Sequence, residues 1–187
     1  EKLLDIYTNP PAFSKFGQIT IGLENDFGFK EEYQRQLDAV INRKLNVVTM
    51  SGFADWYRSR FPDVSPAHLI TSDDPLGSKG KAVWFMNPFY RAGWFYHPTL
   101  YGSAIRDLRN YNDSIPEPCY QTFCASLDLS QNISKPLDEA TYGDRWTIDE
   151  GAISNYQLKQ GKDNISLSYI NHGGKQRTVE FKNRDIF

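Results

Sequence analysis

The stretch ISNYQLKQGKDNISLSYINHGGKQRTVEFKN, residues 153–183, decides the fold of the second half of the chain. It contains three runs in which apolar and polar residues alternate, and in the middle run Ile165, Leu167 and Tyr169 share one face. An alternation with a period of two is typical of a half-buried strand. The two connections, KQGKDN and NHGGKQ, contain glycines that can supply the positive φ of a hairpin turn. The stretch therefore predicts a three-stranded antiparallel meander that belongs to a β-sandwich.

Upstream of the meander, short runs rich in aromatic and β-branched residues are also predicted to be strands. A helical turn is expected near residues 103–109. Residues 66–187 are thus predicted to form a mainly antiparallel, β-rich domain. Its remaining strand candidates are KAVWFM (81–86), AGWFYH (92–97), SLDLS (126–130) and RWTIDE (145–150).

The first part of the chain has a different pattern, in which predicted strands and helices alternate. The predicted strands are QITIGLEN (18–25) and NVVTM (46–50). The predicted helices are FKEEYQRQLDAVINRK (29–44) and FADWYRSRF (53–61), the second with Ser51 as its N-cap. A strand–helix–strand unit of this length normally forms a right-handed crossover between parallel strands. We therefore expect the two strands to be parallel neighbours in one sheet.

Apolar residues define the packing faces of both predicted helices. Tyr33, Leu37, Val40 and Ile41 recur at helical spacing and form one face of the first helix. Trp56 lies on the apolar face of the second helix. It is expected to pack that helix onto the sheet, so that Trp56→Ala costs ~3–5 kcal/mol of stability.

Two parallel strands cannot close a sheet, so the first part of the chain is expected to be incomplete by itself. We interpret it as the terminal strand–helix–strand–helix piece of an α/β barrel or sheet whose other strands lie upstream in the same polypeptide. The alternative is a mixed sheet that recruits strands from the second half. Pro62 and Pro66 mark the predicted boundary, with residues 1–65 as the C-terminal part of the α/β domain and residues 66–187 as a β-rich accessory domain. The predicted fold class is α+β.

The charge balance excludes some classes of function. The chain has 187 residues, with 21 Lys and Arg against 23 Asp and Glu, whereas nucleic-acid-binding proteins and polybasic membrane-surface binders have a strong basic excess. No apolar run approaches the ~18 residues of a membrane-spanning helix. The chain begins at Glu1 without a signal segment, so it is expected to be a processed product or a fragment. Its localisation stays open, with an extracellular or cell-envelope location as one option.

Glu24 and Asp26 are the candidate catalytic residues. They follow the predicted strand QITIGL at its carboxyl end, which is where parallel sheets and barrels place their ligands. Two carboxylates at this spacing could perform acid–base chemistry or bind a metal. The structural alternative is that Asp26 caps a turn and Glu24 forms an ion pair.

No metal or cofactor motif is evident in the sequence. His68, His97 and His172 have no partner at ligand spacing, and P-loop, dinucleotide-binding and nucleophile-elbow sequences are absent. We therefore predict no metal site and leave the cofactor unknown. Cys119 and Cys124 are interpreted as free, mostly buried thiols, because a disulfide between them would close only a small loop.

The aromatic content is high, and many of the rings gather in WFMNPFYRAGWFYHPTLY (84–101). The 12 Phe, 11 Tyr and 4 Trp make up 14% of the chain. Aromatic rings interspersed with Arg, Asn and His can stack on a sugar ring and hydrogen-bond its hydroxyls. The alternative, a core hairpin, is the more common use of such rings. The candidate carbohydrate-binding residues are Trp84, Tyr90, Arg91, Trp94 and Tyr96.

A family resemblance is carried by ITIGLENDF (19–27), EEYQRQLDAV (31–40) and NVVTMSGFADWYRSRFP (46–62). This order resembles the closing strands and helices of glycoside hydrolase and polysaccharide-deacetylase barrels, and it is most similar to the family-57 glycoside hydrolase type. The resemblance implies a carbohydrate-active enzyme in which a β-rich domain follows the barrel. It also implies that the main catalytic and metal-binding residues lie on upstream strands outside this chain. Gly52 stands where the pattern often has an acid.

Three hypotheses for the function follow from these patterns. The chain is the C-terminal part of a carbohydrate-active hydrolase or deacetylase acting on a polysaccharide, inactive by itself. Alternatively, it is a non-catalytic carbohydrate-binding module, or a structural β-sandwich domain of a cell-surface protein. In the first two cases the expected partner is a carbohydrate, and in none of them is it a nucleic acid. The substrate, its linkage and the oligomeric state are not encoded in any recognisable motif.

Overall fold

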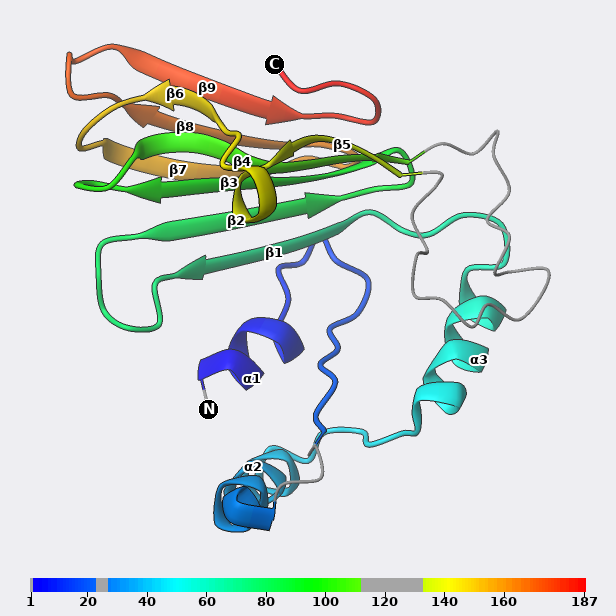
Figure 1. Ribbon diagram of the computed structural model, residues 1–187. Helices are drawn as coiled ribbons and strands as arrows, with labels where there is room; N and C mark the ends of the chain where they lie inside the picture. The colour runs from blue at the N-terminus through cyan, green and yellow to red at the C-terminus, as the bar shows by residue number, and fades with distance from the viewer. Residues whose placement is uncertain (1, 23–26, 112–132) are drawn as a thin grey trace.

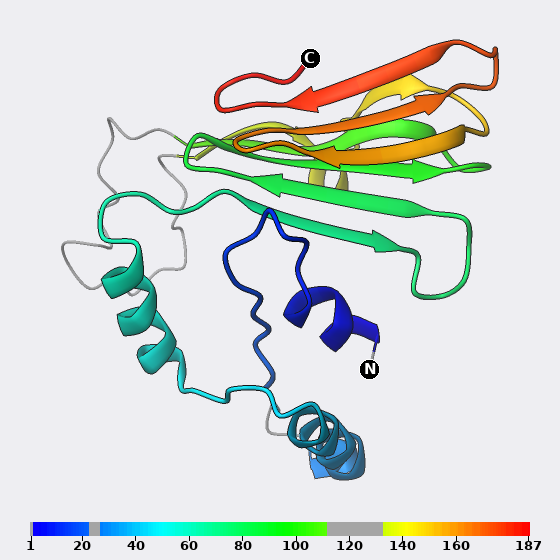
Figure 2. The same cartoon turned by 180° about the vertical axis from the view of Figure 1, so that it is seen from behind.

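The computed structural model of the protein describes residues 2–22, 27–111 and 133–187. It is an α+β structure in which two antiparallel sheets stack face to face, with the longer helices on the outer side of one sheet (Figures 1 and 2). Sheet A has the order β1-β2-β3-β4-β5, with β6 also paired to β4, and sheet B is β7-β8-β9. The strands are β1 His68–Asp73, β2 Lys81–Met86, β3 Tyr90–His97, β4 Gly102–Tyr111, β5 Ile133–Asp138, β6 Trp146–Asp149, β7 Ser154–Gln160, β8 Ile165–Ile170 and β9 Gln176–Phe181. The helices are α1 Lys2–Thr8, the 3₁₀ turn η1 Phe27–Phe29, α2 Lys30–Asn42, α3 Met50–Arg60 and α5 Glu139–Tyr142.

The hydrophobic core lies between the two sheets. In β8 every second side chain is buried, as the alternation predicts, and Ile165 and Leu167 are fully buried. Sheet A contributes Phe85 and Trp94, which are fully buried as well. Burial of side chains of this size contributes about 1.5–3 kcal/mol each. The other buried members of this core are Leu69, Val83, Tyr90, Ala92, Tyr96, Ile105, Tyr169, Val179 and Phe181.

The meander predicted for residues 153–183 is confirmed. Strand β8 pairs antiparallel with both β7 and β9, and the β8–β9 register places Leu167 opposite Val179. The β8–β9 hairpin turns at Gly174, whose φ is +76°. KAVWFM (81–86) forms β2 with the predicted bounds, and AGWFYH and RWTIDE contribute to β3 and β6.

The helical turn predicted near residues 103–109 is wrong. Gly102–Tyr111 forms β4, which pairs with β3, β5 and β6, and its Ile105 is fully buried. A strand that pairs on both sides gains sheet hydrogen bonds and core packing that override weak local helix preference. Strands β1 and β5 had no predicted counterpart, and β5 accepts Pro136 because it lies at a sheet edge. The candidate strand 126–130 lies outside the described residues.

The strand–helix–strand–helix prediction for residues 18–61 is right in its helices and wrong in its strands. Helices α2 and α3 form, but 18–22 and 46–49, the described residues of the predicted strands outside α3, belong to no sheet. These two segments make no backbone hydrogen bond to each other, so the expected parallel pairing is absent among the described residues. A lone pair of short parallel strands gains too little to form without a larger sheet.

The helices α1 and α2 share a small hydrophobic cluster apart from the main core. Leu4 of α1 is buried against Ala39 and Val40 of α2. Ile41, expected on the packing face of α2, is instead 67% exposed, because the strands that were expected to cover that face are not formed. None of the described helices is long and apolar enough to cross a membrane.

Helix α3 is held by aromatic contacts rather than by full burial. It begins earlier than predicted, so its N-cap is Thr49 and not Ser51, and Thr49 Oγ1 accepts a 3.1 Å hydrogen bond from the Gly52 N–H. None of its side chains is fully buried. The ring of Phe16 lies between helix and sheet, with centroids 5.4–6.0 Å from the rings of Phe53, Trp56, Tyr57, Phe61 and His68.

Residues 11–16 form a strap across the edge of the sandwich. Ser14 Oγ accepts a hydrogen bond from the Leu69 N–H (2.8 Å) and donates one to the Leu69 carbonyl (2.9 Å), so it pairs with the outer edge of β1. The Phe13 N–H donates to Gln160 Oε1 at the end of β7 (3.0 Å). The strap therefore connects both sheets to the first part of the chain.

A buried polar network joins the two sheets around Asp149 of β6. Trp94 Nε1 donates to Ser103 Oγ (2.9 Å), and the Tyr169 hydroxyl lies 2.9 Å from both Ser103 Oγ and Asp149 Oδ2. Because a carboxylate only accepts, the phenol donates to Asp149. Asn171 Nδ2 donates to the other carboxylate oxygen (2.7 Å). The network fixes β6 and β8 relative to β3 and β4.

Asp149 should make stability depend on pH. Burial opposes its ionisation, but hydrogen bonds from Asn171, Tyr169 and Arg177 outweigh burial and lower the pKa of this carboxyl. Its contribution is therefore complete above the unfolded pKa of about 3.9 and is lost as the pH falls through the lower folded pKa. We expect Asp149→Asn to lower the free energy of unfolding at pH 7 by about 1–3 kcal/mol and to flatten its decline below pH 4. Urea titrations across pH test this, and the exposed Asp144→Asn is the control.

Candidate functional site

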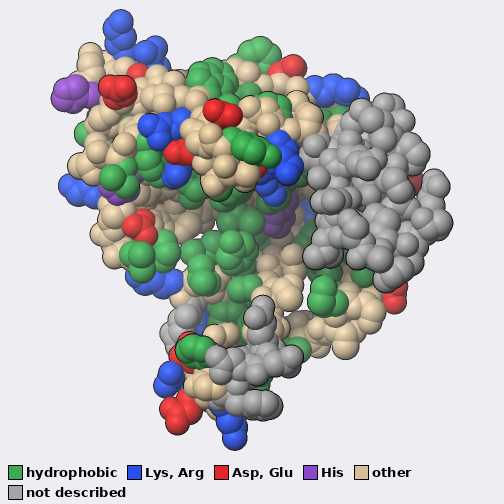
Figure 3. All heavy atoms as spheres, in the orientation of Figure 1, with side chains coloured by type: hydrophobic (Ala, Val, Ile, Leu, Met, Phe, Trp, Pro, Cys, Tyr) green, Lys and Arg blue, Asp and Glu red, His purple; other side chains and the backbone are tan. Residues whose placement is uncertain are grey.

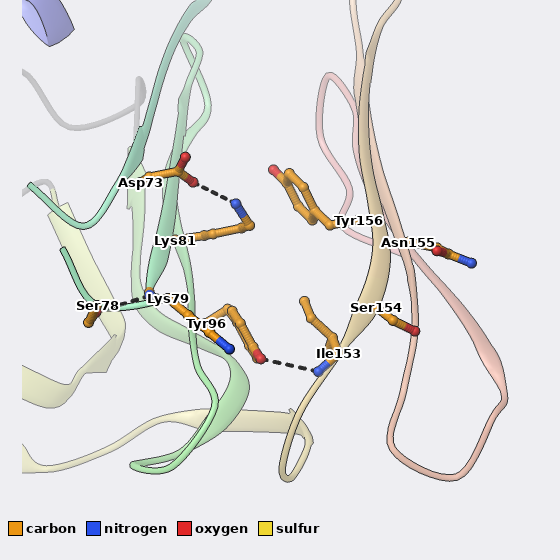
Figure 4. Close-up of a pocket in the computed structure, with 10 residues that line it drawn as sticks. Asp73, Ser78, Lys79, Lys81, Tyr96, Ile153, Ser154, Asn155 and Tyr156 are labelled. Carbon is orange, nitrogen blue, oxygen red and sulfur yellow. Dashed lines mark hydrogen bonds and ion pairs between the residues drawn. The ribbon is translucent and has the colours of Figure 1, made fainter.

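A cavity of about 410 Å³ opens at the edge of the sandwich, between the two sheets (Figure 4). Its volume lies within the ~300–1,000 Å³ typical of small-ligand sites. One wall comes from the β1–β2 hairpin and β3 of sheet A, and the other from the beginning of β7 in sheet B. The lining residues that carry its chemistry are Asp73, Lys79, Lys81, Tyr96, Ile153 and Tyr156.

An ion pair between Asp73 and Lys81 lies at the mouth of this cavity. The two residues are opposite each other in the antiparallel β1–β2 register, and Lys81 Nζ donates to Asp73 Oδ1 at 2.5 Å. The side chain of Asp73 is 77% exposed, so its carboxylate is open to a ligand, whereas that of Lys81 is 29% exposed. The ammonium also lies 5.2 Å from the centroid of the Tyr156 ring, which faces it across the cavity (Figure 4).

Tyr156 provides the aromatic wall of the cavity. Its ring stacks on the buried ring of Trp94, with centroids 5.7 Å apart and planes at 13°, so its orientation is fixed by the core. Burial and, second, the negative charge of Asp73 raise the pKa of Tyr156 to about 12. The hydroxyl therefore stays protonated at neutral pH and can donate a hydrogen bond to a ligand.

Tyr96 and Lys79 complete the polar surface of the cavity. The Tyr96 hydroxyl accepts a 3.2 Å hydrogen bond from the Ile153 N–H, which ties sheet A to the beginning of sheet B. Tyr96 is opposite Lys81 in the β2–β3 register, so the same strand pairing places both residues. The side chain of Lys79 extends from the β1–β2 loop toward the Tyr96 hydroxyl (Figure 4).

This arrangement suits binding better than hydrolysis. A carboxylate, an ammonium and phenolic hydroxyls beside a ring can hydrogen-bond the hydroxyls of a sugar while the ring packs on its C–H face. Glycoside hydrolysis ordinarily needs two carboxyl groups that flank the scissile bond. Among the described lining residues of this cavity, Asp73 is the only acid.

A second, more apolar cavity of about 300 Å³ lies on the outer face of sheet A, beneath α1. Trp84 and Phe95 meet edge to face there, with centroids 5.4 Å apart and planes at 89°. The Arg91 guanidinium lies 5.3 Å from the Trp84 ring and forms a 3.0 Å ion pair with Asp107, so it is already engaged. Figure 3 shows hydrophobic side chains gathered below the sheets, toward α2.

The five predicted carbohydrate-binding residues do not form one surface. Tyr90, Trp94 and Tyr96 point toward sheet B and are only 3%, 0% and 5% exposed, whereas Trp84 and Arg91 lie on the opposite face of sheet A. The expected stacking platform is therefore corrected: successive strand residues point to opposite faces, and the inward ones became core. Of the five, Tyr96 alone lines the inter-sheet cavity.

The predicted catalytic residues, Glu24 and Asp26, lie outside the described residues, as do Cys119 and Cys124. Their roles stay predictions. Within the described ranges, no group of three His, Cys, Asp or Glu side chains is placed to hold a metal ion.

Asp73, Lys81 and Tyr156 were not predicted as site residues. They meet only through the β1–β2 register and the packing of β7 on sheet A, which sequence spacing does not reveal. One signal was available: Lys81 shares a strand face with Val83 and Phe85, which are both fully buried. A charged residue in phase with core residues marks a place where the core opens to solvent or ligand.

Comparisons with known proteins return no match for this chain. No protein family, curated protein or solved structure matches it. The resemblance to carbohydrate-active barrels thus depends on the quoted residues alone, and the inter-sheet cavity is the main structural guide to function.

Proposed function

We propose that this chain is the C-terminal portion of a carbohydrate-active hydrolase or polysaccharide deacetylase, and that its β-rich half binds a saccharide in the inter-sheet cavity without catalysing a reaction there. The observation that carries the binding part is the Tyr156 ring beside the Asp73–Lys81 ion pair in an open cavity. Two hypotheses from the sequence are thus combined. The second half of the chain is a carbohydrate-binding module, and the whole polypeptide is a carbohydrate-active enzyme.

The chemistry of the cavity supports a saccharide ligand. Neighbouring hydroxyls of a sugar ring can bridge the exposed carboxylate of Asp73 and the ammonium of Lys81, since one accepts and the other donates. The protonated Tyr156 hydroxyl adds a donor, and the partly exposed ring adds apolar surface for the sugar C–H groups. Because Trp94 fixes the Tyr156 ring, little side-chain entropy is lost on binding.

The surface of the first part of the chain supports the wider proposal. Val47 and Val48, in the extended residues that precede α3, are 74% and 53% exposed. Consecutive apolar residues point to opposite sides of an extended segment, as in strands that are buried on both faces of a parallel sheet. We propose that this segment adds to a sheet of an α/β domain supplied by another part of the same polypeptide. Glu24 and Asp26 would then be acid–base candidates of that domain.

Replacing Tyr156 with alanine should weaken saccharide binding by about tenfold or more, because the stacking surface and a hydroxyl donor are both lost. Asp73→Asn should weaken it several-fold, and since that side chain is mostly exposed, the fold should be unaffected. Titration of the full chain with a panel of neutral and acidic methyl glycosides, followed by NMR chemical shifts, measures both effects.

The matched control is Tyr142→Ala, which removes an exposed tyrosine on α5 outside the cavity. It should leave binding unchanged. If no glycoside of the panel shifts resonances of cavity residues, the binding proposal fails, and the chain is better described as a structural domain. Equal losses in Tyr142→Ala and Tyr156→Ala would also contradict the assignment of the site.

A further inference from the structure

We infer that the ligand of the inter-sheet cavity is an acidic saccharide, a uronic acid glycoside whose carboxylate pairs with Lys79. This inference rests on the proposed saccharide-binding function and specifies the ligand of that site. An acid-selective site needs an uncompensated positive charge at the cavity, a well-held backbone beneath that charge and room for a sugar ring.

Two lysines, Lys79 and Lys81, line the cavity together with one carboxylate, Asp73, so one positive charge is left over. Lys81 is paired with Asp73 at 2.5 Å. Lys79 also lines the cavity, and no carboxylate among the described residues lies within ion-pair distance of its ammonium. Its side chain extends from the β1–β2 loop toward Tyr96 (Figure 4). An ammonium and a hydroxyl at one place are suitable donors to a carboxylate.

The backbone at Lys79 is held by the turn that precedes β2. The Asp74 N–H donates to the Gly80 carbonyl (2.9 Å), and the Gly80 N–H donates to Ser78 Oγ (3.0 Å). Asp74 Oδ1 accepts from the Leu76 N–H (2.9 Å), so this carboxylate is used within the turn. The backbone on both sides of Lys79 is therefore held, and only the side chain has to be ordered when a ligand binds.

The Asp73–Lys81 ion pair and Lys79 lie at different places along the cavity. Figure 4 shows Asp73 and Lys81 near the Tyr156 ring, and Lys79 with Tyr96 further along the same wall, which sheet A forms. A pyranose bound next to Tyr156 can therefore present its ring hydroxyls to the ion pair and its C6 carboxylate to Lys79. A neutral hexose would make the first set of contacts and leave Lys79 without a partner, which predicts a preference for the acid.

The test compares methyl glucuronide, galacturonide and mannuronide with their neutral parent glycosides, which differ only at C6. At low ionic strength at least one acidic glycoside should bind about tenfold tighter than its neutral parent, as one charge-assisted contact implies. Lys79→Met should abolish this preference and leave the affinity for the neutral glycoside unchanged. Added salt should weaken only the acidic ligand.

The matched control is Lys162→Met, which removes an exposed lysine in the β7–β8 turn that does not line the cavity, and it should keep the preference. Equal binding of acidic and neutral glycosides by the unmodified protein would overturn this inference and leave the proposed function intact. Competition by inorganic sulfate at the same concentration as the uronide would overturn it too, since the site would then bind any anion. Absence of binding by every glycoside would contradict the proposed function itself.

Discussion

Replacing Gly102 with alanine is expected to lower the free energy of unfolding by at least about 3 kcal/mol. Gly102 begins β4 with a φ of +67°, a conformation that L residues adopt only at a cost of about 1–2 kcal/mol. In addition, a Cβ at this position would overlap the backbone carbonyl oxygen of Asp149 and lie 2.7 Å from Glu150 Cα. These are backbone atoms, so β6 would have to move away from β4. Urea unfolding followed by circular dichroism measures the loss.

Gly174→Ala is the matched control for this substitution. Gly174 has a similar φ of +76°, but a Cβ there would meet no atom within 4 Å. The free energy of unfolding of Gly174→Ala should therefore fall only by the cost of the left-handed conformation, about 1–2 kcal/mol. The difference between the two variants then measures the steric contact between β4 and β6. Equal losses in both would show that this contact has no energetic importance.

Replacing Trp94 with alanine should cost about 3–5 kcal/mol, because it creates a large cavity at the centre of the core. The Trp94 side chain is fully buried, stacks on the ring of Tyr156 and donates a hydrogen bond to Ser103 Oγ. Removal of the indole leaves Ser103 without this donor and Tyr156 without its support. Saccharide binding should therefore weaken together with stability, which urea unfolding and glycoside titration can measure on the same sample.

Trp56→Ala is the comparison for this prediction. The sequence pattern places Trp56 on a buried helix face and predicts a similar loss of ~3–5 kcal/mol. In the structure Trp56 is 45% exposed and contacts a cluster of partly exposed rings around Phe16, so we expect about 1–2 kcal/mol. A loss for Trp56 as large as that for Trp94 would indicate that α3 is packed more deeply than its exposure implies.

Strands with strict alternation could be predicted from the sequence because their pattern is local. The meander and β2 follow directly from residues such as Leu167 and Val83, whose neighbours on the strand are polar or half-buried. Strand β4 could not be predicted in this way. Its outward face carries Asp107 and Arg109, which form ion pairs with residues of β3 and β5 rather than an apolar stripe. The periodicity of β4 becomes visible only when these partners are in place.

The candidate site illustrates the same limit of prediction from local sequence patterns. The aromatic segment was a correct indication that rings are concentrated in β2 and β3, but which rings face a ligand depends on the phase of each strand. Trp94 and Tyr90 point inward and are part of the core. Tyr96 also points inward, but it lies near the end of β3 and therefore lines the cavity. Tyr156 belongs to the other sheet, so no spacing within the aromatic segment could include it.

The strap of residues 11–16 affects how soon the fold can be completed while the chain is being synthesised. Ser14 leaves the ribosome 55 residues before Leu69, and Phe13 leaves it 147 residues before Gln160. At ~5–20 residues per second the second contact has to wait roughly 7–30 s. During that interval sheet B is not yet formed and the strap can contact sheet A alone, so part of its apolar surface is open to other molecules. Newly made chains should therefore depend on chaperones until β7 emerges and the strap can close.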